Sequence, residues 1–133
     1  MINSRKGFTF IELLVVVTII GVLTAVGMVS YTSTNRSARD SKRLADLEQI
    51  RAALEICRSE TGEYPADISS GVVCDGDSYL SPLPSDPWDS KTGYGYTYTQ
   101  NSTTSYDICA TLENDDKCTG TISGTGECCL SNP

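Results

Sequence analysis

The cysteines are the residues of this 133-residue chain with the widest choice of chemistry, because thiols form disulfides, bind metals or act as nucleophiles. There are six of them: Cys57, Cys74, Cys109, Cys118, Cys128 and Cys129. They form no Cys-x-x-Cys pair and the chain has no histidine, which argues against a zinc site, a redox centre or an imidazole-based triad. An even number of cysteines is typical of disulfides made in an oxidising compartment, so we expect residues 57–133 to lie outside the cytoplasm.

Charge is distributed unevenly along the chain. The net charge is -7, from 10 Lys+Arg against 17 Asp+Glu. Residues 61–133 carry two basic and eleven acidic side chains, a net charge of -9. Such a surface repels phosphate groups, so we do not expect nucleic acid as a partner. With neither a histidine nor an activated nucleophile, we also expect no enzyme activity and no cofactor.

An apolar segment from Phe8 to Tyr31 forms the first part of the chain after a short leader. It holds 24 residues, with Glu12 as its one charge. A helix of that length spans about 36 Å, enough to cross a bilayer. The flanking basic residues would place the C-terminus inside, but the disulfide argument places it outside, and large domains translocate largely regardless of such charges. We therefore expect a single-pass membrane protein with its C-terminal domain outside.

The residues around Glu12 carry a family resemblance. A short basic leader (Arg5, Lys6) precedes Gly7 and Phe8, and Glu12 is the fifth residue of the apolar segment that follows. This register resembles the class III signal of type IV prepilins and type II secretion pseudopilins. The resemblance implies that a prepilin peptidase and N-methyltransferase cuts after Gly7 and methylates Phe8, while the helix is retained.

Glu12 requires a partner, because a carboxylate in an apolar helix bundle is costly when uncompensated. The resemblance implies that it neutralises the new amine of Phe8, in its own or in a neighbouring subunit, and so sets the register of assembly. The alternative from charge alone is a carboxylate that is protonated or reaches the membrane interface.

After Tyr31 the chain predicts a second, amphipathic stretch of helix over residues 32–62. Apolar residues recur at spacings of three and four: Leu44, Leu47, Ile50, Leu54 and Cys57. We expect the opposite face, with Arg39, Arg43, Asp46 and Arg51, to be mostly solvated, with weak pairs such as Asp40/Arg43; the alternative is specific ion pairs between subunits. Gly62 is the expected end of the helix.

Residues 63–133 predict a small antiparallel sheet after an irregular loop to about residue 90. The block Leu83–Asp89, with Trp88, and the tyrosines Tyr94, Tyr96 and Tyr98 resemble major pseudopilins. Alternating residues in 94–99 and 106–112 predict a hairpin, and further strands are expected near 118–123 and 127–130. The expected fold is α+β: a pilin fold with one long helix packed on a small, disulfide-linked sheet.

Six cysteines allow fifteen pairings, among which the sequence does not select. We favour Cys57 with Cys74, and different partners for the adjacent Cys128 and Cys129, through Cys109 and Cys118. The resemblance also raises calcium binding by loop acids, although their spacing matches no EF-hand and Asp-rich turns are the default interpretation. These acids are Asp75, Asp77, Asp86, Asp89, Asp115 and Asp116.

The expected organisation is a leader (1–7), a transmembrane and filament-core helix (8–31), its amphipathic continuation (32–62) and an exported globular region (63–133). The expected function is a structural subunit that polymerises into a type IV pilus-like or type II secretion pseudopilus filament. Expected partners are copies of itself, related minor pilins, the peptidase and an inner-membrane assembly platform. The alternative is a monomeric, membrane-tethered binding module that uses the tyrosine row.

Overall fold

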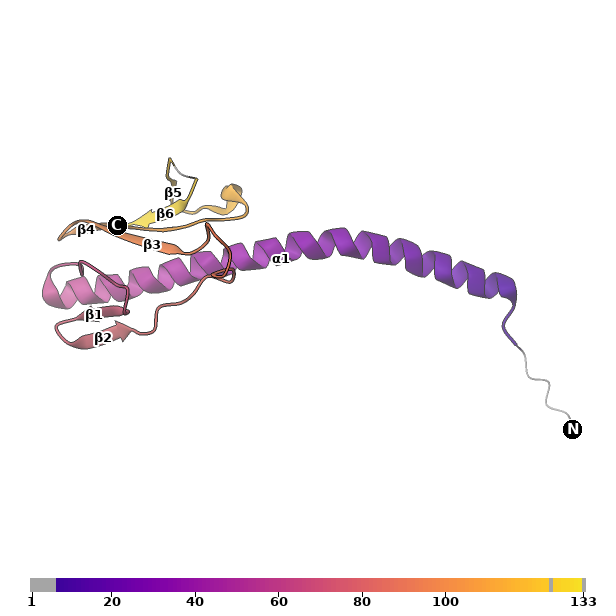
Figure 1. Ribbon diagram of the computed structural model, residues 1–133, viewed down its shortest axis with the longest axis horizontal. Coiled ribbons are helices and arrows are strands. Elements are labelled where there is room, and N and C mark those ends of the chain that lie inside the picture. Colours follow the sequence, from indigo (N-terminus) through magenta and orange to yellow (C-terminus); the bar gives the residue numbers. More distant parts are fainter. Residues whose placement is uncertain (1–6, 125, 133) are drawn as a thin grey trace, which may run out of the picture. The chain divides into compact units, whose positions relative to one another are not determined.

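The computed structural model describes residues 7–124 and 126–132 of the chain. The basic residues of the expected leader, Arg5 and Lys6, lie outside the described residues. One long helix, α1 (Phe10–Thr61), is followed by short strands and a 3-10 turn, η1 (Asp115–Lys117) (Figure 1). Contacts within the chain divide it into two units, Met1–Asn35 and Arg36–Pro133.

The first unit is the apolar part of α1. Among the described residues, α1 is the one helix long and apolar enough to cross a membrane by length and composition, with a mean hydropathy of 2.6 in its most apolar window. The hydroxyls of Thr18 and Thr24 donate to the carbonyls of Val15 and Ile20, each at 2.8 Å, so they add little polarity to the helix surface. The large apolar side chains are exposed: Phe10, Ile11, Leu13, Leu14, Val15, Val16, Val17, Ile19, Ile20, Val22, Leu23, Val26 and Met28.

The second unit is built on the C-terminal part of α1. The predicted apolar stripe is confirmed from Leu47 onward: Leu47, Ile50 and Leu54 are fully buried and Cys57 is 1% exposed, whereas Leu44 is half-buried. The helix ends at Thr61, and Gly62 follows with a positive φ of 84° while its N–H donates to the Arg58 carbonyl at 2.8 Å. This is the glycine C-cap expected at that position.

A two-stranded hairpin lies in the segment that we expected to be irregular. Strand β1 (Val72–Cys74) pairs antiparallel with β2 (Asp77–Leu80). Asp75 and Gly76 connect them with positive φ values of 52° and 93°, as a tight hairpin turn requires. The expectation of no regular structure was therefore wrong here, although an Asp-Gly pair between short apolar runs is a hairpin signal.

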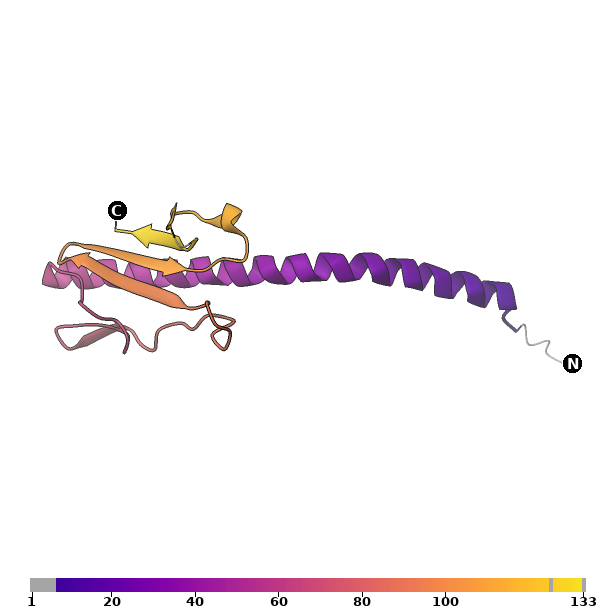
Figure 2. The same ribbon diagram turned by 45° about the horizontal axis from the view of Figure 1, so that its top comes forward.

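The main sheet has four strands over the C-terminal part of α1 (Figures 1 and 2). They are β3 (Tyr96–Ser102), β4 (Ser105–Ala110), β5 (Thr121–Ile122) and β6 (Cys128–Ser131), in the order β3-β4-β6-β5. The predicted hairpin is confirmed as β3 and β4. Tyr106, Ile108 and Ala110 alternate on the buried face and form one core with Leu47, Ile50 and Leu54.

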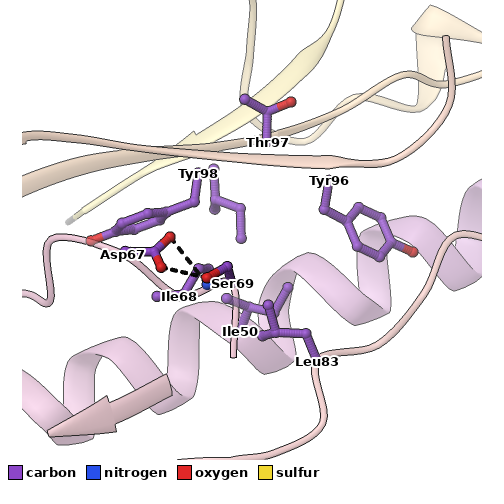
Figure 3. Close-up of a pocket in the computed structure, with 9 residues that line it drawn as sticks. Ile50, Asp67, Ile68, Ser69, Leu83, Tyr96, Thr97 and Tyr98 are labelled. Carbon is purple, nitrogen blue, oxygen red and sulfur yellow. Dashed lines mark hydrogen bonds between the residues drawn. The ribbon is translucent and has the colours of Figure 1, made fainter. Parts of the chain in front are cut away.

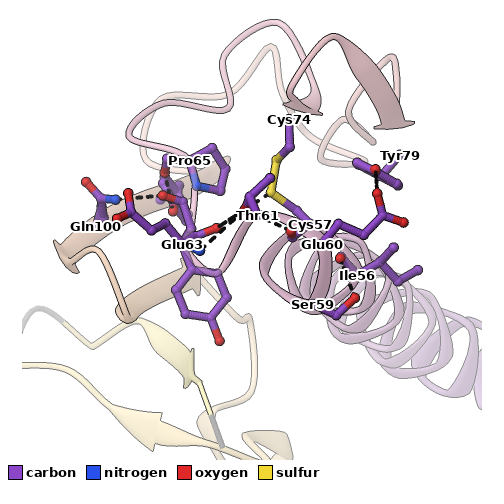
Figure 4. Close-up of a disulfide and its surroundings, with 12 residues drawn as sticks. Ile56, Cys57, Ser59, Glu60, Thr61, Glu63, Pro65, Cys74, Tyr79 and Gln100 are labelled. Atoms are coloured by element: carbon purple, nitrogen blue, oxygen red, sulfur yellow. Dashed lines mark hydrogen bonds between the residues drawn. A yellow bond between two sulfur atoms is a disulfide. The ribbon is translucent and has the colours of Figure 1, made fainter.

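Three disulfides link these elements: Cys57–Cys74, Cys109–Cys129 and Cys118–Cys128. The first joins α1 to β1, which is the pairing that the sequence analysis favours (Figure 4). The adjacent Cys128 and Cys129 reach different partners. Because all six thiols are consumed, no free cysteine remains for redox or metal chemistry.

Replacing Cys57 and Cys74 together by alanine should destabilise the second unit. The bridge joins residues 17 positions apart, and a loop of about that length contributes about 3 kcal/mol by restricting the unfolded chain. Urea unfolding of the full chain in detergent micelles, followed by the fluorescence of its single tryptophan, Trp88, measures the change. An unchanged unfolding midpoint would show that the bridge is not a stabilising link.

Candidate functional site

Glu12 lies in the first turn of α1 and bonds to the residue that starts the helix. The Thr9 N–H donates to Glu12 Oε2 at 2.7 Å, and the Thr9 hydroxyl donates to the same oxygen at 2.8 Å. In return the Glu12 N–H donates to Thr9 Oγ1 at 3.3 Å. This reciprocal arrangement is a capping box. Its signal, Thr-x-x-Glu ahead of an apolar run, is present in the sequence but was not used in our prediction.

The capping box explains why the helix begins at Phe10 rather than at Phe8, where we expected it to start. Gly7, Phe8 and Thr9 precede the helix, and Phe8 is 91% exposed. The peptide bond between Gly7 and Phe8 is thus non-helical. The carboxylate of Glu12 points back toward this segment, one residue from Phe8.

A second cluster anchors the globular unit around Arg43, whose side chain is fully buried. Its Nε and Nη2 donate to the two oxygens of Asp86 at 2.6 and 3.1 Å. Its Nη1 donates to Asp40 Oδ1 at 2.8 Å and to Glu113 Oε1 at 3.2 Å. One guanidinium therefore joins α1, the loop before β3 and the segment after β4.

This cluster overturns the expectation of a solvated polar face on α1. Asp40 is also fully buried, and it accepts the backbone N–H groups of Glu113 and Asn114 at 2.9 and 3.1 Å. Asp46 is buried and accepts the hydroxyl of Tyr96 at 2.6 Å. The polar face is buried because the loop and the end of the sheet bring these partners to it.

Two carboxylates that bind Arg43, those of Asp86 and Glu113, are held in their charged form. Burial by itself would raise the pKa of Asp86, but hydrogen bonds from Arg43 and the Trp88 N–H outweigh it, so the pKa lies below its usual value. Hydrogen bonding from Arg39 lowers the pKa of Glu113, against a smaller effect of burial. Burial opposes the charge of Arg43, yet its bonds to Asp86 and Asp40 raise its pKa.

Acid should therefore unfold the second unit through this cluster. Asp86 and Glu113 have lower pKa values in the folded than in the unfolded chain, so their contribution is full above the unfolded values, about 4 to 4.5. It is lost as the pH falls through the lowered folded values. We expect the urea midpoint to drop steeply below about pH 4, and less steeply in Asp86→Asn. If the urea midpoints of the unmodified chain and of Asp86→Asn fall in parallel as the pH is lowered, Asp86 does not contribute to the loss of stability in acid.

Aromatic rings surround the outer side of the cluster. The Arg39 guanidinium lies 3.9 Å from the Trp88 ring centroid, and the Lys91 ammonium lies 4.1 Å from it. Arg43 lies 4.6 Å from the centroid of Tyr94, which packs edge-on against Trp88. The segment from Asp86 to Tyr94 thus anchors the loop on α1 through its contacts with Arg39 and Arg43.

The tyrosine row of β3 is part of the core rather than an open platform. Tyr96 and Tyr98 are half-buried and pack against the core cluster. Their hydroxyls donate to Asp46 and to the Pro65 carbonyl, each at 2.6 Å, and burial raises the pKa of Tyr98 to about 12. The alternative of a tethered binding module therefore loses the feature that would have supported it.

The loop acids do not gather in the described part of the chain. Asp86 is committed to Arg43, Asp75 and Asp77 lie at the β1–β2 turn, and Asp115 and Asp116 lie in η1. Among the residues that the structure describes, no three His, Cys, Asp or Glu side chains are grouped as metal ligands would be.

An apolar N-terminal helix, capped by Glu12 and continuing under an antiparallel sheet, defines an α+β protein of a kind suited to membrane anchoring. Residues 2–28 match the family model of the prokaryotic N-terminal methylation motif. The chain is 35% identical over 82 residues to prepilin peptidase-dependent protein D of Escherichia coli, covering 62% of this chain and 51% of that protein.

Two further relatives are named as a fimbrial protein and as a protein of a secretion system. Type IV major fimbrial protein FimA of Dichelobacter nodosus is 35% identical over 80 residues, covering 58% of this chain and 51% of FimA. Type II secretion system core protein G of Pseudomonas aeruginosa is 30% identical over 100 residues, covering 65% of this chain and 70% of that protein. The chain belongs to the type IV pilin and type II secretion pseudopilin family.

The matched region spans about half the length of the first two of these relatives, at 51% of each. No solved structure matches the chain.

Proposed function

We propose that this chain is a structural subunit that polymerises through its N-terminal helix into a pilus-like or pseudopilus filament. The observation that carries the proposal is the exposed apolar part of α1, whose one charge, Glu12, lies in its first turn within the methylation motif. A helix of this kind must be covered by lipid or by other helices. Copies of the same helix can replace lipid around it when subunits leave the membrane.

Processing prepares the end of the helix for this transfer. A peptidase hydrolyses the peptide bond between Gly7 and Phe8, which leaves a positive amine on Phe8, and a methyl donor then supplies a methyl group to that amine. The Glu12 carboxylate already points toward this segment, through its bonds to Thr9. It neutralises the amine of its own or of a neighbouring subunit, because neither charge is stable alone among apolar helices.

Processing and assembly require four kinds of partner: copies of the same chain, related minor pilins, the prepilin peptidase and an inner-membrane assembly platform. Before assembly the chain is a single-pass protein of the cytoplasmic membrane, with its disulfide-linked unit outside. The subunit itself catalyses no reaction. In support, all six cysteines are in disulfides and the chain has no histidine.

Electron microscopy of sheared surface fractions tests the proposal. Cells that express the chain together with its own assembly machinery should yield filaments that an antibody against residues 61–133 decorates. Cells that lack the peptidase should retain the chain in the membrane fraction. Equal amounts of the chain in the membrane, and no labelled filament in either strain, would overturn the proposal.

A further inference from the structure

The four-stranded sheet has two unlike free edges. Its order, β3-β4-β6-β5, leaves the seven-residue β3 at one side and the two-residue β5 at the other. In the described chain the outer edge of β3 faces no strand. The Tyr64–Pro65 segment bonds to its C-terminal half: Tyr64 N donates to Thr103 O at 2.8 Å, and the side chains of Gln100 and Tyr98 donate to the carbonyls of Tyr64 and Pro65.

Neither edge strand contains a proline or a charged residue. Proteins protect free strands with proline, with charged side chains or with a covering element. The sequence of β3 is YTYTQNS and that of β5 is TI, without a charge or a proline in either. Residues 61–133 have a net charge of -9, and these two strands are places where two copies can meet without bringing like charges into direct contact.

A cavity of about 200 Å³ lies beneath β3. The rings of Tyr96 and Tyr98 flank it below β3, Ile50 lines it from α1, and Leu83 and the Asp67–Ser69 loop border it (Figure 3). This volume is several times the roughly 30 Å³ that one water molecule takes up in the liquid, which leaves room for one aliphatic side chain. It lies under the edge strand, on the face of the sheet that is turned toward α1.

An exposed aliphatic side chain on β5 points to the same face. Ile122 is 55% exposed and pairs with Cys128, which pairs in turn with the buried Ala110 of β4. Residues that are directly opposite on neighbouring strands share a face. Ile122 therefore lies on the helix-facing side of the sheet, at its β5 edge.

We propose that the β5 edge of one copy adds to the β3 edge of a second copy, so that Ile122 enters the cavity beneath Tyr96 and Tyr98. When a strand adds to an edge the faces of the sheet continue, so the helix-facing Ile122 arrives on the side where the cavity lies. Backbone hydrogen bonds hold the two edges, and the side chain in the cavity fixes the register.

The pairing of unlike edges agrees with an open assembly, and this step rests on the proposed filament function. Contact of β3 with β3 would be a two-fold interface, which closes at a dimer. Contact of β3 with β5 leaves one free edge of each kind at the two ends of the pair. Such a heterologous contact repeats from copy to copy and suits neighbouring subunits of a filament.

Photo-crosslinking of assembled filaments tests the contact directly. An aliphatic diazirine amino acid placed at Ile122 should join two chains when irradiated, and mass spectrometry should find the linked peptide at Leu83 or Tyr96–Tyr98 of the second chain. Val73, 41% exposed on β1, is the matched control position and should give no such product. In addition, Ile122→Ser should lower filament yield about tenfold, the cost of not burying an isoleucine, while Val73→Ser should leave it unchanged.

The outcomes separate the two proposals. Filaments whose links from Ile122 map to another surface would overturn the β3–β5 contact and leave the filament function intact. If the unmodified chain also forms no filament, both the proposed function and the β3–β5 contact are overturned. If Ile122→Ser lowers both the unfolding midpoint and the yield, the crosslink position alone decides the question.

Discussion

Glu12→Gln should abolish filament assembly while leaving the chain inserted in the membrane. Glutamine replaces glutamate in a capping box, so the bonds to Thr9 and the start of α1 are retained. What is lost is the negative charge that would neutralise the amine of Phe8 among apolar helices. We expect at least a tenfold loss of sheared filaments, since one uncompensated buried charge costs several kcal/mol and about 1.4 kcal/mol corresponds to a factor of ten.

Thr9→Ala is the matched control for this experiment. It removes the cap, at a cost of about 1 kcal/mol to the first turn, but keeps the carboxylate. Filament yield in Thr9→Ala should therefore stay within a few-fold of the unmodified chain. If Thr9→Ala is as defective as Glu12→Gln, then Glu12 acts by capping the helix and its proposed pairing with the amine is wrong.

Arg43→Met should unfold the second unit at a much lower urea concentration. Removal of the guanidinium leaves Asp40 and Asp86 buried without their positive partner, and loss of one member of a buried pair costs about 3–5 kcal/mol. Arg43→Lys should recover part of this, because an ammonium cannot reproduce the paired bonds to Asp86. Trp88 fluorescence of the full chain in micelles reports the transition.

Arg51→Ala is the control for the loss of an arginine on the same helix. Its Nη1 lies 3.7 Å from Glu48 Oε1 and the Glu48 side chain is 55% exposed, so we expect less than about 1 kcal/mol. The deficit of Arg43→Met should also shrink as the pH is lowered, because burial without Arg43 raises the pKa of Asp86 and protonation then removes the unpaired charge. A similar midpoint for Arg43→Met and Arg51→Ala would contradict the role given to Arg43.

The periodic features of this fold could be predicted from the sequence. Leu47, Ile50, Leu54 and Cys57 repeat with the helical period, and the strands β3 and β4 alternate with a period of two. Burial of one face follows directly from such patterns. The sheet and its position in the chain were therefore predictable, with strand bounds that differ by a few residues.

The burial of Arg43 could not be predicted in this way. A charged residue on the polar face of a helix is usually solvated, and its partners Asp86 and Glu113 lie 43 and 70 positions away. No local sequence pattern predicts contacts between residues that are so far apart in the chain. Only the tertiary structure brings the loop and the end of β4 to that face.

Two local signals were present and unused. The Asp75-Gly76 pair marks the β1–β2 turn, and Thr9 with Glu12 marks the capping box. Glu12 is thus a helix cap as well as the one charge of the apolar segment. Both roles use the same carboxylate, which is why Glu12→Gln and Thr9→Ala must be compared.

The mass of the N-terminal peptide tests the central claim most directly. The chain should be isolated from cells that express its own processing machinery and digested, and its N-terminal peptide should be measured. The filament account predicts a peptide that begins at Phe8 and carries one added methyl group. A peptide that begins at Met1 would contradict it, because the amine that Glu12 is proposed to neutralise at the start of the apolar helix would not exist.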